Sequence, residues 1–257
     1  MYFTKFTEEP IKIYGLKVID PQNSIYQRLP DSKSSLVSAD VCGRARTCMG
    51  GRIRFRTDSK ELVVRTSVHQ DLPDKCISIA GSVGLDVFDG SLESIRYLGC
   101  AAPENYNTCE FEYGFSGSAK GELPMADIIS EDNFRIIIMD YDFNAPNPEF
   151  LRETHEPFFL RLREKNANTP IVLMSRPCYD SNIPDSIARR EVVRETFVRA
   201  RARGDKNTYF IDGELMFGEI DRECCCVDEV HPTDLGHMRI AEYIYPTLKR
   251  LLDNGIK

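Results

Sequence analysis

An aspartate and a histidine three residues apart near the end of the chain could form an acid–base pair. Asp228 and His231 lie in the stretch V-D-E-V-H-P-T-D-L-G-H that begins at Val227. On a turn, the Asp228 carboxylate can accept the N–H of one ring nitrogen, which leaves the other nitrogen free to act as a base. Because Pro232 restricts His231 to an extended backbone, the ring would sit on a rigid loop. The spacing predicts general-base chemistry, although a surface loop that precedes a helix would explain the same residues.

Two further stretches carry groups that could stabilise a negative charge developing on an oxygen. Asn144 comes a few residues after an apolar run that ends at Asp140, and its side-chain N–H could point at an oxyanion. Gly117 lies in the glycine-flanked turn G-F-S-G, whose backbone N–H could do the same. Alone, Asn144 could instead cap the helix that follows, and Gly117 could be an ordinary turn glycine. The order of the motifs and their positions after predicted strands favour the catalytic interpretation.

Three consecutive cysteines, Cys224 to Cys226, suggest a different class of site. Together with Asp228 and His231 they could form a metal-binding module. Adjacent cysteines cannot easily point at one tetrahedral ion, so we expect no bound metal and no cofactor. The chain has nine cysteines, an odd number, and is long enough to need no disulfide for stability, so we expect reduced thiols.

The elements that must position these groups have the pattern of a parallel sheet. Three continuously apolar runs are typical of strands buried on both faces: Arg135–Asp140, Thr169–Met174 and Tyr209–Asp212. Apolar residues at helical spacing predict a helix after each run: Phe150–Leu162, Ile187–Phe197 and Leu235–Leu252. We expect His155, beside two glutamates in the first of these helices, to lie on a solvated face. Alternating strands and helices predict an α/β domain, and Ser175 to Pro177 would line a cleft at the carboxyl edge of its sheet.

In the first part of the chain, apolar and polar residues alternate with the two-residue period of antiparallel strands. Ile53–Thr57 and Glu61–Thr66 alternate around a turn and predict a hairpin, and Val83–Phe88 with Ile95–Leu98 predict another. We see no amphipathic helix here. The pattern therefore predicts a small β-sandwich, jelly-roll-like, over residues 1–113, ahead of an α/β domain over residues 114–257.

The composition of the chain limits which binding partners and which cellular location we expect. The chain has 257 residues, is 42% hydrophobic and carries a net charge of −7 without a basic cluster, so we expect no nucleic-acid partner. No apolar run approaches the length of a membrane span, and the first residues do not resemble a secretion signal. We expect a cytoplasmic protein with no membrane partner, acting on a small molecule or an oligosaccharide.

The motifs resemble those of the SGNH (GDSL-type) hydrolases, most closely the bacterial subgroup with a β-sandwich before a flavodoxin-like catalytic domain. The resemblance lies in Gly117 of G-F-S-G, Asn144 of D-Y-x-x-N-A-P-N, and Asp228 with His231 of D-x-x-H-P-x-D-x-G. It implies that Asp228 orients His231, that His231 is the general base and then the general acid, and that Gly117 and Asn144 form an oxyanion hole. It also implies hydrolysis of acyl esters, with acetyl esters of carbohydrates as the expected substrates.

One block of that family is absent from the sequence. The family's nucleophilic serine lies in a G-x-S-I-x-x-G segment ahead of the glycine turn, and here the sandwich-like residues 95–103 run almost directly to Gly114. Ser94 and Ile95, followed by Gly99, match this block only loosely, and we interpret Ser94 as a hairpin residue. The nucleophile is therefore unassigned, and the catalytic domain should lack its first strand. We expect slow or no ester hydrolysis, and the alternative is a non-catalytic protein that binds carbohydrates or esters.

Overall fold

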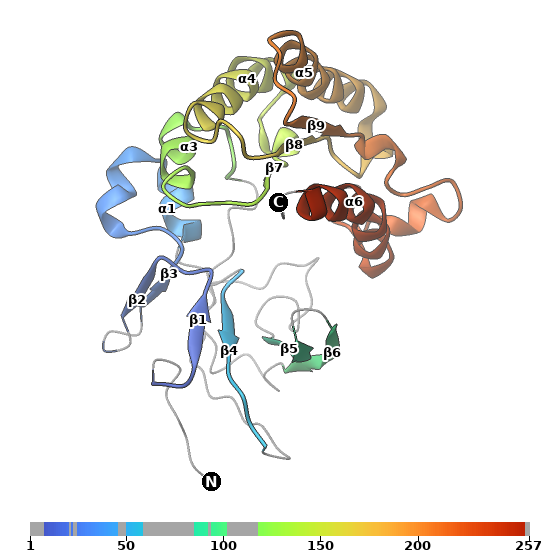
Figure 1. Cartoon of the computed structure of the whole chain (residues 1–257). Coiled ribbons are helices and arrows are strands. Elements are labelled where there is room, and N and C mark those ends of the chain that lie inside the picture. The colour runs from blue at the N-terminus through green and yellow to red at the C-terminus, as the bar shows by residue number, and fades with distance from the viewer. Residues whose placement is uncertain are drawn as a thin grey trace. The chain divides into compact units, whose positions relative to one another are not determined.

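The chain divides into two compact units, Met1–Ser118 and Ala119–Lys257, in a computed structural model (Figure 1). The structure describes residues 8–20, 22, 25–45, 50–58, 85–91, 94–101 and 118–254. The boundary that the sequence predicts, between residues 113 and 114, lies outside the described residues. Each unit is described by itself below.

The described part of the first unit is rich in short antiparallel strands. They form three pairs: β1 (Lys12–Tyr14) with β4 (Arg52–Arg54), β2 (Val18–Asp20) with β3 (Ile25–Gln27), and β5 (Leu85–Ser91) with β6 (Ser94–Ala101). Sequences in which apolar and polar residues alternate typically form such antiparallel pairs. A β-rich first unit is thus confirmed, whereas its closure into a sandwich stays a prediction.

The hairpin predicted near residue 90 is present as β5–β6. Gly90 has a φ of +118°, and a Cβ there would collide with the Ser94 carbonyl oxygen, so only glycine suits this position. The other predicted hairpin stays a prediction; its first strand is present as β4, whose Ile53 pairs on one side with Ile13 of β1. Its expected partner, Glu61–Thr66, lies outside the described residues.

The first unit also contains two short helices, which the sequence analysis did not predict. A 3-10 helix, η1, spans Asp31–Leu36, and α1 spans Ala39–Ala45. The Ser38 hydroxyl accepts a hydrogen bond from the Val41 N–H at 3.4 Å and caps α1. A helix of seven residues buries only two side chains, so it leaves no periodic stripe that the sequence could reveal.

The second unit is an α/β domain, which confirms the predicted fold class. Its parallel sheet has the order β7 (Ile137–Met139), β8 (Ile171–Met174) and β9 (Thr208–Ile211) in the described residues. The helices are α3 (Leu123–Ile129), α4 (Pro148–Lys165), α5 (Ile183–Ala202) and α6 (Asp234–Asn254). Short 3-10 helices are η3 (Asp142–Asn144), η4 (Tyr179–Asn182), η5 (Gly213–Leu215) and η6 (Arg222–Cys225). Among the described residues, no helix combines the length and the apolar character needed to cross a bilayer.

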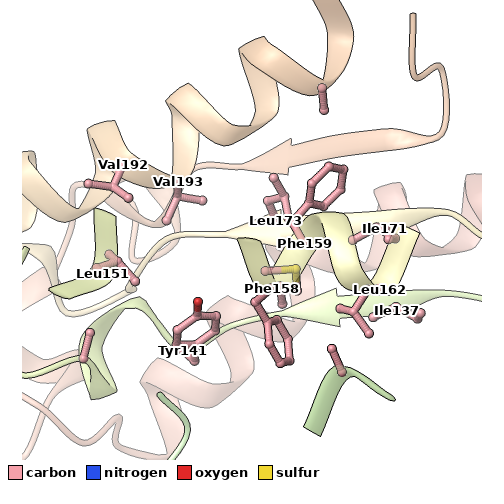
Figure 2. Close-up of a cluster of buried hydrophobic side chains, with 14 residues drawn as sticks. Ile137, Tyr141, Leu151, Phe158, Phe159, Leu162, Ile171, Leu173, Val192 and Val193 are labelled. Carbon is pink, nitrogen blue, oxygen red and sulfur yellow. The ribbon is translucent and has the colours of Figure 1, made fainter. Parts of the chain in front are cut away.

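Helices cover both faces of the sheet, as Figure 1 shows with α3, α4 and α5 on one side and α6 on the other. The central strand β8 alternates between the two layers. Ile171 and Leu173 pack in the core under α4 and α5, whereas Val172 and Met174 pack in the core under α6. All four residues of β8 are buried, which explains its continuously apolar sequence. The first of these cores is shown in Figure 2.

His155 lies in the core, contrary to the expectation of a solvated face. It is 1% exposed, its ring stacks on Tyr141, and its Nδ1 lies 2.9 Å from the Thr196 hydroxyl. The Thr196 hydroxyl donates to the Val192 carbonyl, so Nδ1–H of His155 must be the donor to Thr196. Burial lowers the pKa of His155 to about 4. A neutral histidine with one satisfied N–H fits an apolar helix face, and this is the physical reason the prediction failed.

Candidate active site

Asp228 and His231 form a hydrogen-bonded pair in the loop before α6. Asp228 Oδ2 lies 2.7 Å from His231 Nδ1, and Asp228 Oδ1 accepts the backbone N–H groups of Val230 at 3.1 Å and His231 at 2.8 Å. An ionised carboxylate can only accept, so His231 Nδ1 carries a proton, and in the neutral ring Nε2 is the nitrogen with the lone pair. The His231 side chain is 42% exposed, so this base can be reached from solvent. The structure thus brings together the two residues that the spacing paired.

The loop that carries the pair is closed on itself. The Val227 N–H donates to the His231 carbonyl at 2.8 Å, and Cys226 forms an isolated antiparallel bridge with Pro232. At its tip Glu229 has a φ of +66°, a left-handed conformation that non-glycine residues adopt at a cost. This tight turn is what lets the Asp228 carboxylate fold back onto the ring.

Thr233 joins the loop to the start of α6. Its hydroxyl accepts the Gly236 N–H at 3.2 Å and donates to the Cys224 carbonyl at 2.8 Å, while its own N–H donates to the Cys225 carbonyl at 2.9 Å. The hydroxyl acts as the N-cap of α6, which satisfies one of the free N–H groups at the helix start. The Asp228–His231 loop is therefore fixed to a helix at its carboxyl end.

A disulfide between Cys178 and Cys226 fixes the other end of the loop to the segment after β8. The expectation of reduced thiols throughout is therefore wrong. The two residues are 48 positions apart, with Cα atoms 6.6 Å from each other, so only the folded sheet brings them together. Cys224 and Cys225 stay free thiols, the first exposed and the second buried.

The disulfide also affects the alternative interpretation, a metal-binding module at Cys224 to Cys226. Cys226 cannot be a thiolate ligand while it is bonded to Cys178. Within the ranges that the structure describes, no three or more histidine, cysteine or acidic residues gather in a way that could hold a metal ion.

Asn144 ends η3, directly after the Asp142 and Phe143 turn that follows β7. It is partly buried, and its backbone N–H donates to the Tyr141 carbonyl at 3.0 Å. The helix cap that Asn144 could have supplied is Asn147, whose side chain accepts the Phe150 N–H at 2.8 Å. Capping therefore does not explain Asn144.

Asp142 is a buried acid in this turn that the sequence analysis missed. It is 1% exposed, and its Oδ2 accepts the Arg176 N–H at 3.0 Å. Burial, and to a smaller extent the nearby charge of Asp140, raise the pKa of Asp142 to about 7, although the hydrogen bonds from two backbone N–H groups and the positive charge of Arg176 act in the opposite direction. Near neutral pH this carboxyl changes its protonation state at the edge of the sheet. An acid next to a strand end is no signal by itself, since such residues are usually exposed.

Arg176 connects the Asn144 turn to the Asp228–His231 loop. Its guanidinium carbon lies 3.9 Å from the centre of the Phe143 ring, and its Nη2 donates to the Ser181 hydroxyl and lies 3.5 Å from the Glu229 carbonyl. The side chain is 3% exposed. Because one buried residue touches both segments, Asn144 and His231 come from loops that meet at the same edge of the sheet.

The structure does not bring the other predicted residues into this site. Gly117 and the neighbouring Ser116 lie outside the described residues. Ser94 is the first residue of β6, paired with Ser91 across the hairpin end. This is the hairpin position that the sequence predicts for Ser94, in the first unit.

Comparisons with known proteins agree with this architecture. The sequence model of the GDSL-like lipase/acylhydrolase family matches residues 106–249, more than half of the chain. A model of the N-terminus of SGNH-hydrolase-type esterases matches residues 1–121. No curated protein matches the sequence significantly.

Two solved structures share the fold over most of the chain. The salicylyl-acyltransferase SsfX3 from a tetracycline biosynthetic pathway is 14% identical, with a TM-score of 0.64 over 95% of this chain and 96% of its own. A protein from Bacteroides ovatus described as a GDSL-like lipase is 17% identical, with a TM-score of 0.61 over 73% of this chain and 80% of its own. At these identities the likeness shows the fold.

Proposed function

Because the chain belongs to the GDSL-like lipase/acylhydrolase family, we propose that it hydrolyses acyl esters with the Asp228–His231 pair as its acid–base unit. The observation that carries the proposal is the 2.7 Å contact between Asp228 Oδ2 and His231 Nδ1. This contact sets the tautomer of the ring and leaves Nε2 as the base. The two backbone N–H bonds to Asp228 also fit an ordinary Asx turn, so the ring contact is the feature that supports catalysis.

The chemistry that we propose uses water as the nucleophile. His231 Nε2 takes a proton from a water molecule while the water oxygen bonds to the ester carbonyl carbon, whose oxygen becomes an oxyanion. When the tetrahedral intermediate collapses, the bond to the alcohol oxygen breaks and His231 returns the proton to that oxygen. The products are one carboxylic acid and one alcohol. The Asp228 carboxylate stabilises the imidazolium that forms between the two steps.

We assign the oxyanion hole to the Asn144 side chain and the Gly117 N–H. The support for Asn144 is its place at the end of η3, directly after Phe143. Arg176 contacts both Phe143 and the Asp228–His231 loop. A donor aimed at the oxyanion is typically worth ~10²–10³-fold in rate. Gly117 is carried over from the family motif alone.

The substrates that we propose are acetyl esters of carbohydrates. The support is the resemblance of the motifs, together with the exposure of His231, which is 42% exposed and therefore open to a bulky substrate. The net charge of −7 disfavours strongly anionic esters.

We expect turnover to be slow, because the sequence has no G-x-S-I-x-x-G block to supply a serine nucleophile. Without the nucleophile of a serine hydrolase, binding and the oxyanion hole alone still give ~10³–10⁴-fold acceleration over water in a protease studied in detail. A fluorophosphonate probe with peptide mapping tests this directly. We expect p-nitrophenyl acetate to be hydrolysed slowly with no serine labelled, and rapid labelling of Ser94 or Ser116 would show that a serine nucleophile exists.

The same missing block favours a second function, a non-catalytic protein that binds carbohydrates or esters. The two functions differ in a pair of measurements on the full chain. Binding of acetylated oligosaccharides by calorimetry, with no acetate released above the buffer rate, would support the binding protein. Release of acetate that saturates with substrate concentration would support the hydrolase.

A further inference from the structure

We propose that Arg189 is a positioning residue that fixes the turn carrying Asn144. Arg189 Nη1 donates to the Asp142 carbonyl at 2.5 Å and to the Ala145 carbonyl at 2.9 Å. These two carbonyls stand on either side of Asn144 in the chain. The inference rests on the proposed function, because the position of Asn144 matters to catalysis only if its side chain faces the oxyanion.

Arg189 is itself held in place from α5. It is 5% exposed, and its Nε donates to Asp185 Oδ2 at 2.7 Å, one helical turn earlier. With the Nε end fixed to its own helix, the planar guanidinium presents its other N–H groups in a set direction. Through this contact, the rigid helix α5 fixes the position of the Asn144 backbone.

The turn needs a donor from outside. A 3-10 helix of three residues leaves carbonyl groups at its end without partners inside the helix. Leaving such a group buried and unpaired costs ~1–3 kcal/mol, so a single nitrogen that binds two of them holds the turn strongly. Ala145 is 3% exposed, which keeps its carbonyl away from competing water.

The other neighbours of Asn144 are fixed as well. The Phe143 ring lies 3.9 Å from the guanidinium of Arg176 and 5.8 Å from that of Arg189, measured from the ring centre. The Asp142 carboxylate binds the Arg176 N–H at 3.0 Å. Contacts therefore hold the residues before and after Asn144, and the two carbonyl bonds from Arg189 are the ones that span it.

The kinetic consequence follows from how oxyanion donors work. Their contribution depends on a placement that is set before the reaction, and a displacement of ~1 Å can cost ~10²-fold in rate. We expect Arg189→Lys to lower kcat by ~10–100-fold with KM changed less than ~2-fold, since one ammonium cannot reproduce the fork that joins two carbonyls and Asp185. Arg189→Gln, which leaves no buried charge, serves as the second variant. Arg194→Lys is the matched control, because Arg194 lies on the same helix and binds only Glu191 at the surface in the described contacts.

The test needs a readout that does not depend on turnover. In the ¹⁵N-labelled full chain, the Asn144 side-chain amide signal is identified by its loss in Asn144→Asp. We expect Arg189→Lys and Arg189→Gln to shift this signal and the Ala145 backbone amide and to speed their exchange with solvent, whereas Arg194→Lys leaves both unchanged. Unchanged Asn144 and Ala145 signals in both folded Arg189 variants would overturn the inference.

The kinetic arm separates this inference from the proposed function. If the amide signals shift but Asn144→Ala hydrolyses p-nitrophenyl acetate as fast as the parent chain, Arg189 positions the turn and the oxyanion role of Asn144 is wrong. If Asn144→Ala is slow while Arg189→Lys keeps the parent kcat, the oxyanion role holds and the positioning role is wrong.

Discussion

Cys178 is bonded to Cys226, and this covalent link ties the segment after β8 to the loop that carries Asp228 and His231. The loop is thus held at one end by a covalent bond and at the other by the Thr233 cap of α6. Two fixed ends hold the loop in one orientation, which the general-base role that we propose for His231 requires.

Removing the disulfide should destabilise the chain. A bond that closes a loop of this separation, 48 residues, typically contributes ~2–4 kcal/mol by limiting the unfolded chain. We expect Cys178→Ser and Cys226→Ser each to lower the free energy of unfolding by about that amount, measured by urea denaturation without reductant. Cys224→Ser, at an exposed free thiol, is the control and should keep the parent midpoint. If dithiothreitol lowers the midpoint of the parent no more than that of Cys178→Ser, the disulfide is not formed in solution.

At position 229, glycine should destabilise the chain less than a residue with a branched Cβ. Its φ of +66° places it in the left-handed region, which costs side chains with a branched Cβ ~1–2 kcal/mol or more. Glu229→Gly should therefore leave the unfolding free energy nearly unchanged, and Glu229→Val should lower it by ~1–2 kcal/mol. Thermal unfolding of the two variants checks this, and equal melting temperatures for both would contradict the left-handed conformation.

Asp142 should make the chain less stable as the pH rises. Its folded pKa is raised to about 7 by burial, above that of an unfolded chain, so the folded state holds the proton more tightly. Its contribution to stability is fully present below about pH 4 and is lost as the pH rises through about 7. Asp142→Asn, which stays neutral, should be more stable than the parent at pH 8, and this difference should shrink at pH 5. A variant less stable than the parent at pH 8 would mean that the charge of Arg176 outweighs the cost of burial.

His155 should make the chain less stable as the pH falls, over nearly the same range of pH. Its folded pKa is lowered from 6.5 to about 4, so the unfolded state takes up the proton first as the pH falls. The stability that neutral His155 provides is present above about pH 6.5 and is lost as the pH falls towards 4, by ~3 kcal/mol in total. His155→Asn keeps a donor for the Thr196 hydroxyl and does not titrate. Its unfolding free energy should therefore fall less steeply than that of the parent between pH 6.5 and 4.5, and identical slopes would show that His155 is not buried in neutral form.

The features that a short stretch of chain determines could be predicted from the sequence. Three continuous apolar runs predicted β7, β8 and β9. The run of β8 is apolar because this strand is buried on both faces, whereas Ile138 of β7 is 43% exposed. The contact of Asp228 with His231 could be predicted because three residues suffice to close the turn.

The features that depend on distant segments could not be predicted. Nothing in the spacing of nine cysteines selects Cys178 as the partner of Cys226. Arg189 has the appearance of a surface residue in a charged helix, and its contact with the Asp142 carbonyl spans 47 positions. His155 was misplaced for the same reason, since its partner Thr196 is 41 positions away.

The dependence of ester hydrolysis on His231 tests the central claim most directly. Initial rates of p-nitrophenyl acetate hydrolysis are compared for the full chain, His231→Gln, Asp228→Asn and the control His237→Gln, whose histidine is exposed in the first turn of α6. A positioned general base contributes ~10²–10⁴-fold, so His231→Gln and Asp228→Asn should fall by at least ~10²-fold or to the buffer rate, while His237→Gln keeps the parent rate. If His231→Gln hydrolyses the ester as fast as the parent chain, the Asp228–His231 pair is not the acid–base unit of this protein.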